Sequence, residues 1–320
     1  MKHLTILVPD GENNLSSIVG AYKIFSRANA YRKEVFQIEL AGISKTVEFH
    51  GGLFSAKPHK DISEIKKTNL VIIPSLNHNY TNSVAVNGKL IDWIGMQYRE
   101  GAAIASICTG AFLLAAAGLL DGKSCSTHWS AADELRMRHP KIKVQPDQLI
   151  TDEQGICTNG GAYSFLNLIL YLVEKYYDRE TAIYCAKVFQ IEIDRENQSS
   201  FMVFKGQKTH GDALIKKAQD YIESHSTGKI ATEELAASLA IGRRNFDRRF
   251  IRATGNTPTE YAQRVKVEAA KKAFETSRKT VNEVMFEVGY SDQKAFREVF
   301  RKITGLSPLE YRHRYNKDAA

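Results

Sequence analysis

The sequence contains no stretch of about 18 uninterrupted apolar residues, the length that a helix needs to cross a bilayer. It also contains no low-complexity tract, and its 43% hydrophobic and 25% charged residues are usual for a globular protein. The apolar run at the start of the chain turns at Asp10–Gly11 and is too short for a secretory signal. We therefore expect a cytoplasmic globular protein, and 320 residues favour two domains.

Cysteine is scarce. Cys108, Cys125, Cys157 and Cys185 are far apart and form no CxxC or Cys/His metal pattern, and the nine histidines are scattered as well. Without an export signal, the cysteines are expected to be reduced thiols. We therefore predict no metal site and no cofactor.

Positive charge is unevenly distributed. The chain carries a formal net charge of +8, and residues 212–320 hold 21 Lys/Arg against 15 Asp/Glu. The basic excess thus lies mostly in the last third, which favours an acidic partner for that part of the chain.

Short apolar, β-branched runs alternate with helical patterns from residue 1 to about 193. This alternation predicts βαβ units and a mostly parallel sheet that is covered by helices on both faces. We predict an α/β three-layer sandwich of the flavodoxin-like kind for residues 1–193. Strands are expected at 4–9, 35–43, 69–74, 102–107 and 155–160, and helices at 17–32, 90–101, 111–120 and 161–177.

The periodicity changes near residue 194. Residues 194–211 are polar and contain glycine, and they are predicted to be a linker. From Asp212 onward every segment has a helical pattern, so residues 212–320 are predicted to form an all-α domain. Helices are expected at 213–225, 232–240, 243–255, 258–276, 280–289, 292–305 and 307–315.

The helical domain contains an internal repeat. A shift of 50 residues overlays Asn245–Arg264 on Ala295–Arg314 with eight identities, where chance gives about one or two. The identical pairs are Phe246/Phe296, Phe250/Phe300, Thr254/Thr304, Gly255/Gly305, Pro258/Pro308, Glu260/Glu310, Tyr261/Tyr311 and Arg264/Arg314.

Each copy is predicted to be a helix-turn-helix unit. A short helix, 232–240 or 281–288, ends at a turn that carries glycine, Ile241–Gly242 or Gly289–Tyr290. The second helix has phenylalanines four residues apart, which places both rings on one buried face.

The opposite face of each second helix is mostly basic, and the second helix of such a unit enters the major groove of DNA. Arginine matches guanine edges, glutamine matches adenine edges, and other cations neutralise phosphates. An arginine-rich helix face is also compatible with a merely solvated surface, but the duplication favours DNA binding. DNA contacts are predicted at Arg243, Arg244, Asp247 and Arg248 in the first unit and at Gln293, Lys294, Arg297 and Arg301 in the second.

Residues 212–316 resemble the DNA-binding domain of AraC/XylS-type transcriptional regulators. The resemblance rests on EVMFEVGYSDQKAFREVFRKITGLSPLEYR (283–312). It implies two helix-turn-helix units, joined by a long helix at 259–276, that contact successive segments of the major groove. The sequence departs from the family at Glu298, which is acidic where a basic or neutral residue is common.

In the first domain an apolar strand runs directly into Cys108, which is followed by Thr109–Gly110 and a helix. This order is typical of a nucleophile elbow, a turn that projects its side chain at the carboxyl end of a sheet. The helix dipole would lower the pKa of the Cys108 thiol, and backbone N–H groups there could bind an oxyanion or a carboxylate.

Together with CSTHW (125–129) and ICTNGGAYSFLNLILYLVE (156–174), this elbow resembles the PfpI-like, class I glutamine-amidotransferase-like superfamily, in particular its isocyanide-hydratase and amidase-like branch. Regulators that fuse such a domain to an AraC-type module are known, so the resemblance covers nearly the whole chain. It implies that Cys108, Thr109, Gly110 and His128 form the ligand site.

The resemblance also identifies a missing catalytic group. Enzymes of this superfamily use a carboxylate after the first strand to orient the cysteine, and the expected position is Ser16 here. Asp10 and Glu12 are nearby but out of register. A thiol without a positioned acid or base has a poorer route to catalysis, so we expect a protein that is not an enzyme.

Three functions remain in view. The first is a transcription factor that binds double-stranded DNA and a small-molecule effector near Cys108, with homodimer formation left open. The second is a cysteine-dependent amidase or hydratase with an accessory DNA-binding domain. The third, a protein-interaction module, requires other chains to cover the basic helix faces, and salt-dependent DNA binding would exclude it.

Overall fold

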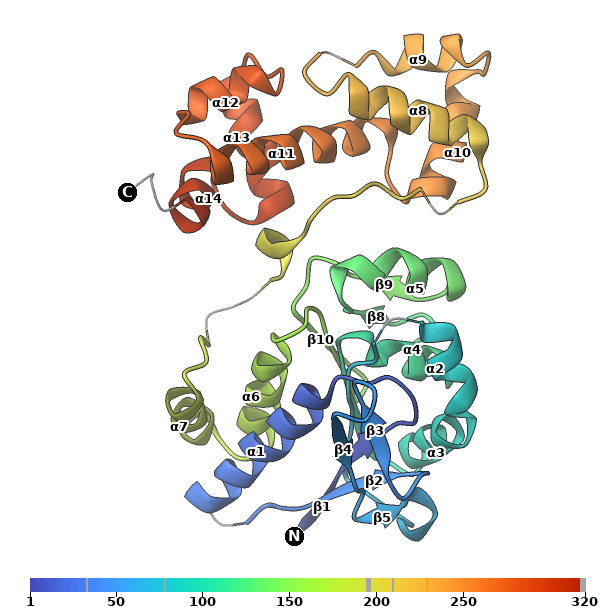
Figure 1. Cartoon of the computed structure of the whole chain (residues 1–320), viewed down its shortest axis with the longest axis vertical. Coiled ribbons are helices and arrows are strands. Elements are labelled where there is room, and N and C mark those ends of the chain that lie inside the picture. The colour runs from blue at the N-terminus through green and yellow to red at the C-terminus, as the bar shows by residue number, and fades with distance from the viewer. Residues whose placement is uncertain (33, 78, 194–196, 209, 229, 317–320) are drawn as a thin grey trace. The chain divides into compact units, whose positions relative to one another are not determined.

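The structure is a computed structural model that describes residues 1–32, 34–77, 79–193, 197–208, 210–228 and 230–316. The chain divides into two compact units, residues 1–198 and 199–320 (Figure 1). Of the predicted linker at 194–211, residues 194–196 and 209 lie outside the described part. The described residues from 199 onward belong to the second unit.

A seven-stranded sheet forms the centre of the first unit, in the order β10-β11-β7-β6-β1-β2-β5. Neighbouring strands are parallel except β10 and β11. The order β2-β1-β6-β7-β11 is the flavodoxin-like one, as predicted. The strands of this unit are β1 (Lys2–Val8), β2 (Phe36–Gly42), β3 (Val47–Phe49), β4 (Phe54–Ala56), β5 (Lys60–Asp61), β6 (Leu70–Ile73), β7 (Ala103–Ile107), β8 (Ser124–Cys125), β9 (Lys143–Val144), β10 (Ile150–Glu153) and β11 (Ile156–Asn159).

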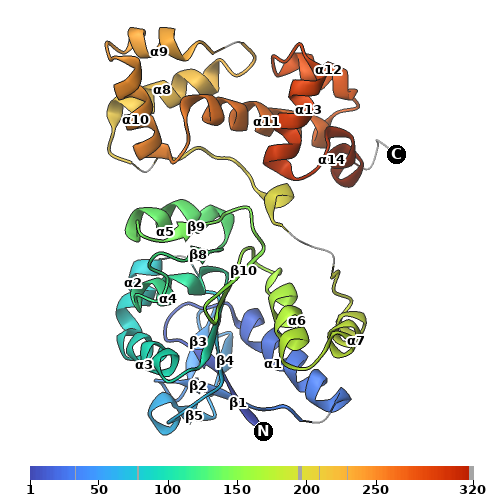
Figure 2. The same ribbon diagram turned by 180° about the vertical axis from the view of Figure 1, so that it is seen from behind.

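Helices cover both faces of this sheet, which confirms the predicted three-layer sandwich (Figures 1 and 2). Helices α1, α6 and α7 lie on one face, and α2, α3 and α4 lie on the other. Each face has its own apolar core, because the central strands are buried on both sides. The helices are α1 (Leu15–Tyr31), α2 (Tyr80–Val86), α3 (Gly88–Arg99), α4 (Ala111–Ala116), α5 (Ala132–Arg138), α6 (Phe165–Tyr176) and α7 (Arg179–Phe189).

The described part of the second unit contains helices and no strand, as predicted. The long helix α11 contributes to two separate apolar cores, one in each repeat. None of the helices in the described part of the chain is long and apolar enough to cross a membrane. The helices of this unit are α8 (Ala213–Ser224), α9 (Thr232–Ser238), α10 (Arg243–Thr254), α11 (Pro258–Thr276), α12 (Val281–Glu287), α13 (Gln293–Thr304) and α14 (Pro308–Tyr315).

The repeated sequence forms repeated structure at the starts of α11 and α14. Thr257 and Ser307 cap these helices, and each accepts a hydrogen bond from the N–H of a glutamate three residues on. Glu260 and Glu310 in turn accept from the N–H of the cap residue. Both helices therefore begin with a capping box followed by proline, which fixes where α11 and α14 begin.

Residues 199–208 pack along the helical unit. The Ser200 carbonyl accepts a hydrogen bond from the hydroxyl of Tyr315, and the Phe204 N–H donates to Glu268 of α11 at 3.1 Å. Lys208 pairs with two carboxylates of α8. This part of the predicted linker is thus held against both repeats.

Candidate nucleic-acid interface

The two helix-turn-helix units have the same turn but different turn residues. The residue with positive φ is Gly289 in the second unit (φ 74°) and Ala240 in the first (φ 53°). The N–H of each donates to the carbonyl three residues earlier. The prediction that Gly242 makes the first turn was wrong, because Gly242 has φ −64° and caps α10.

Each second helix buries two phenylalanine rings in the core of its own unit, as predicted. These are Phe246 and Phe250 in α10 and Phe296 and Phe300 in α13. Phe250 makes an edge contact with Tyr261 at 5.4 Å between ring centroids, and Phe300 makes the same contact with Tyr311 at 5.5 Å. Because the rings fix one face of each helix to the core, the opposite face is exposed.

On α10 the four predicted contact residues fall into two groups. Arg244 and Arg248 are exposed. Arg243 instead donates through Nε to both carboxylate oxygens of Asp247 at 2.9 Å, and its Nη1 lies 2.5 Å from Glu233 of α9. Arg243 and Asp247 thus form an internal ion-pair cluster that joins the two helices of the first unit.

On α13 all four predicted residues are exposed. The Gln293 amide donates to Asn282 of α12 at 2.7 Å, and Lys294 lies 4.0 Å from Glu298. Among the described residues, no carboxylate lies within ion-pair distance of Arg297 or Arg301. The second unit therefore presents two unpaired arginines on its outward face.

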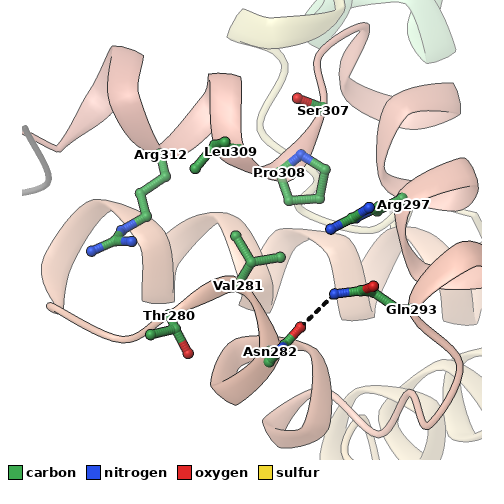
Figure 3. A pocket seen from close by; sticks show the side chains of 9 residues that line it. All are labelled: Thr280, Val281, Asn282, Gln293, Arg297, Ser307, Pro308, Leu309 and Arg312. Atoms are coloured by element: carbon green, nitrogen blue, oxygen red, sulfur yellow. Dashed lines mark hydrogen bonds between the residues drawn. The ribbon is translucent and has the colours of Figure 1, made fainter.

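A pocket of about 530 Å³ brings two of these predicted residues together with one that the sequence did not indicate (Figure 3). Gln293 and Arg297 of α13 face the start of α12 across this pocket, and Arg312 of α14 completes it. The helical pattern predicted α14, but no local signal shows that Arg312 turns toward α12. The lining residues are Thr280, Val281, Asn282, Gln293, Arg297, Ser307, Pro308, Leu309 and Arg312.

In the α/β unit, residues 1–198, the predicted elbow at Cys108 is present. β7 ends at Ile107, Cys108 has φ 54°, and α4 begins at Ala111. A positive φ is strained for a residue with a side chain, so the surrounding structure must hold it. Gly110 contributes to this, because a Cβ on it would lie 2.6 Å from the Pro74 carbonyl oxygen.

The Cys108 thiol is buried, with 3% of the residue exposed. Burial raises the pKa of this thiol, while the Ser75 hydroxyl, the N–H and hydroxyl of Thr109 and the N–H of His128 act in the opposite direction. The prediction that the helix dipole would lower the thiol pKa was therefore wrong, because desolvation is the larger effect. The groups that act to lower this pKa include two backbone N–H groups, those of Thr109 and His128.

Two other predicted site residues have hydrogen-bond partners inside the domain. The Thr109 hydroxyl donates to the Leu76 carbonyl at 2.6 Å and accepts from the Leu76 N–H at 2.9 Å. The His128 ring contacts Ser130 through Nδ1, with 2.7 Å to the serine hydroxyl. Thr109 thus ties the elbow to the end of β6, and His128 reaches Cys108 through its backbone.

Ser16, at the position expected for a catalytic carboxylate, is exposed at the start of α1. Its neighbour Ser17 is the buried residue and accepts a hydrogen bond from the Ser75 N–H at 3.2 Å. Ser75 in turn contacts the Thr109 hydroxyl at 3.0 Å. The residue directed toward the elbow is therefore Ser17, which, like Ser16, lacks a carboxylate.

Cys125, Cys157 and Cys185 are buried in the cores of the first unit, as predicted for packing residues. Within the described ranges, no group of three or more histidine, cysteine or acidic side chains is placed to hold a metal ion.

Two family models match this chain. One, described as the DJ-1/PfpI family, covers residues 6–175, and the other, described as a helix-turn-helix domain, covers residues 235–314. A curated relative is the HTH-type transcriptional regulator GbdR of Pseudomonas aeruginosa, with 23% identity over 229 residues. That match covers 71% of this chain and 62% of GbdR.

Solved structures with a similar fold are of two kinds. One is a protein from Vibrio parahaemolyticus described as a putative transcriptional regulator, with a TM-score of 0.54 and 24% identity. That match covers 58% of this chain and 98% of the other. Another is Drosophila melanogaster DJ-1beta, with a TM-score of 0.52, 18% identity and coverage of 60% and 98%. At these identities the likeness concerns the fold alone.

Proposed function

This chain belongs to the DJ-1/PfpI family over residues 6–175 and carries an AraC-type helix-turn-helix region over residues 235–314, and from this premise we propose that it is a transcriptional regulator. In this proposal the helical unit binds specific duplex DNA, and the α/β unit binds a small-molecule effector near Cys108. Effector binding then biases DNA binding, as a coupling free energy between two sites.

The observation that carries the DNA-binding proposal is the matched exposure of two recognition helices. Arg244 and Arg248 on α10 and Lys294, Arg297 and Arg301 on α13 are exposed, and each of these helices buries a phenylalanine pair on its other side. Arginine near the start of such a helix reaches guanine O6 and N7 in the major groove, and the remaining cations contact phosphates. A merely solvated face does not require this arrangement to occur twice.

The donors around Cys108 support the effector site. The backbone N–H groups of Thr109 and His128 act on the Cys108 sulfur at the elbow, where Cys108 has φ 54°, and in this proposal they would face the effector. Such a site favours a carboxylate or another oxygen acceptor. Thr109 and Gly110 would contribute by holding the elbow.

Catalysis by Cys108 is the weaker alternative. Burial raises the pKa of its thiol and so keeps it protonated. At the start of α1, where a catalytic carboxylate is expected, the chain has Ser16 and Ser17. Neither serine can supply the carboxylate that the superfamily's enzymes use to orient the cysteine. We infer a sensor in which this elbow binds a ligand without turning it over.

Selection of bound fragments from random duplex DNA tests the proposal. The full chain is expected to enrich one motif with two half-sites about one helical turn apart. Enrichment of no motif, with equal binding to all duplexes, would contradict sequence-specific regulation. The effector site is tested in parallel by the thermal stability of the protein with small carboxylates, comparing the natural chain with Cys108→Ala.

A further inference from the structure

The pocket between α12, α13 and α14 has no electrostatic equivalent in the first repeat. In the second unit its charged lining residues are Arg297 and Arg312, with no lining carboxylate. The turns at Ala240 and Gly289 occupy the same place in the two repeats, and so do the repeated phenylalanines. This alignment gives the residues of the first helix-turn-helix unit that correspond to the lining residues. Arg297 corresponds to Asp247 and Arg312 to Ala262, while Gln293 and Asn282 correspond to Arg243 and Glu233.

At this place the first helix-turn-helix unit therefore has one positive and two negative charges, whereas the second helix-turn-helix unit has two positive charges. Arg243 contacts both Asp247 and Glu233, so its charge is neutralised and the cluster keeps a net charge of −1. The same location is thus an internal ion-pair cluster in one repeat and an open cationic pocket in the other.

The two arginines of the pocket are available to an anion. Arg297 has no ion-pair partner in the described part of the chain, and the buried Nε of Arg312 has no acceptor there. One Nη of Arg312 reaches the Arg278 carbonyl at 3.4 Å. The nearby Glu283 carboxylate accepts from the N–H and hydroxyl of Thr280 at 2.6 and 2.7 Å, and these bonds, more than the charge of Arg312, lower its pKa. Figure 3 shows Arg297 and Arg312 on either side of Val281.

A buried guanidinium nitrogen without an acceptor favours a ligand with oxygen acceptors, and arginine matches the geometry of phosphate. Gln293 and Arg297, two of the predicted DNA contacts on α13, line this pocket, so the phosphate of a bound duplex is the anion that the proposed function would bring to it. We propose that Arg312 binds a backbone phosphodiester of DNA, with Arg297 on the opposite wall, and that the first unit lacks this contact. This inference rests on the proposed DNA-binding function.

The consequence is a duplex held asymmetrically. The second unit contributes a sequence-independent, salt-sensitive contact through Arg312. The equivalent place in the first unit contributes none, because its arginine is already neutralised.

The test is the salt dependence of DNA binding by the full chain, measured by fluorescence anisotropy with the selected duplex and with a scrambled one. Each phosphate contact adds about 0.9 to the slope of log K against log salt. Arg312→Gln is expected to lower that slope by about one and to weaken binding to both duplexes equally. Between roughly 50 and 200 mM salt, the variant should therefore lose about threefold less affinity than the natural chain. Arg312→Lys is expected to restore the slope.

Two matched variants complete the design. Arg99→Gln removes the same charge from an exposed position on α3 of the other domain, and it is expected to change nothing. Arg243→Gln removes the arginine of the first-unit cluster and is expected to leave the slope unchanged. Circular dichroism melts of every variant show whether it is folded.

A slope unchanged by Arg312→Gln in a folded protein would overturn the inference, as would an equal fall with Arg243→Gln. Inorganic phosphate distinguishes the source of the anion. One outcome would assign the pocket to a free anion and overturn the DNA contact. In that outcome free phosphate stabilises the natural chain but not Arg312→Gln, and the substitution leaves the salt slope of DNA binding unchanged. If the natural chain binds neither duplex, the proposed function itself fails.

Discussion

The side-chain amide of Gln293 donates a hydrogen bond to Oδ1 of Asn282 at 2.7 Å and joins the first turn of α13 to the first turn of α12. In the first unit Arg243 and Glu233 join α10 to α9 at the same place, with 2.5 Å between nitrogen and oxygen. The two repeats therefore fix the angle of the second helix with the same connection. One uses neutral amides and the other uses charges, which leaves the two DNA-facing surfaces electrostatically different.

Asp247→Asn is expected to strengthen non-specific DNA binding. The substitution removes one of the two carboxylates that pair with Arg243 and leaves Glu233, so the net charge of the cluster rises from −1 to zero and it repels phosphate less. The salt slope should rise by up to about one, the effect of one added positive charge. Anisotropy with a scrambled duplex measures this, and Asp92→Asn on the exposed side of α3 is the control. Unchanged binding would show that this cluster does not face the duplex.

Arg248→Ala is expected to weaken binding to the selected duplex by about 1–3 kcal/mol and to relax the preference at one base position. Arg248 is exposed on α10, and within the described residues its guanidinium donates to the Asn245 side chain of the same helix at 3.1 Å. A second round of selection with the variant measures the preference. Equal weakening on every duplex would assign Arg248 to the phosphate backbone instead.

Phe250→Ala is expected to destabilise the first repeat by about 3–5 kcal/mol, because the ring is fully buried and its loss leaves a cavity. Phe286→Ala is a matched control, since that ring is 63% exposed on α12. Urea unfolding followed by circular dichroism measures both. Equal stability of the two variants would mean that the Phe250 side of α10 is not packed as described.

The turn residues predict substitutions of opposite sign. Ala240→Gly is expected to stabilise the first unit by about 1 kcal/mol, because alanine is strained at φ 53°. Gly289→Ala is expected to destabilise the second, because φ is 74° and a Cβ would lie 2.0 Å from the Thr227 carbonyl oxygen. Thermal denaturation distinguishes the two, and effects of the same sign would contradict the shared turn.

The buried thiols of the α/β unit predict that this unit loses stability at alkaline pH. Burial raises the pKa of Cys125 and of Cys157 from 9.0 to about 12. The native thiols stay protonated while the unfolded ones ionise, so their contribution is complete below about pH 9 and is lost as pH rises from there toward 12. Each group contributes about 1.4 kcal/mol per pH unit in that range.

Urea unfolding between about pH 8 and 11 measures this slope, and Cys125→Ala should reduce it by about one proton. A variant slope equal to that of the natural chain would contradict the assignment of this thiol to a dry core.

The fold was largely predictable because its determinants are local. Alternation of apolar runs places β1, β2, β6, β7 and β11, and the 50-residue repeat places both helix-turn-helix units. The hairpin of β3 and β4, the helix α7 and the short strands β8 and β9 were not among the predicted elements. Three-residue strands have too short a pattern to be distinguished from loops.

The site was less predictable because its properties depend on tertiary neighbours. The sequence places Cys108 at an elbow, but the sign of its pKa shift follows from the depth of burial. Arg243 and Asp247 lie on the predicted face, yet Glu233 of another helix decides that they pair internally. The first turn was predicted at Ile241–Gly242 because the sequence has a glycine there, whereas the residue with positive φ is Ala240.

The most direct test of two DNA-binding units in one chain is a chemical footprint of the natural protein on its selected duplex. The account predicts two protected major-groove segments about one helical turn apart, one lost in Arg248→Ala and the other in Arg297→Ala. Protection of a single segment that both substitutions abolish together would contradict it.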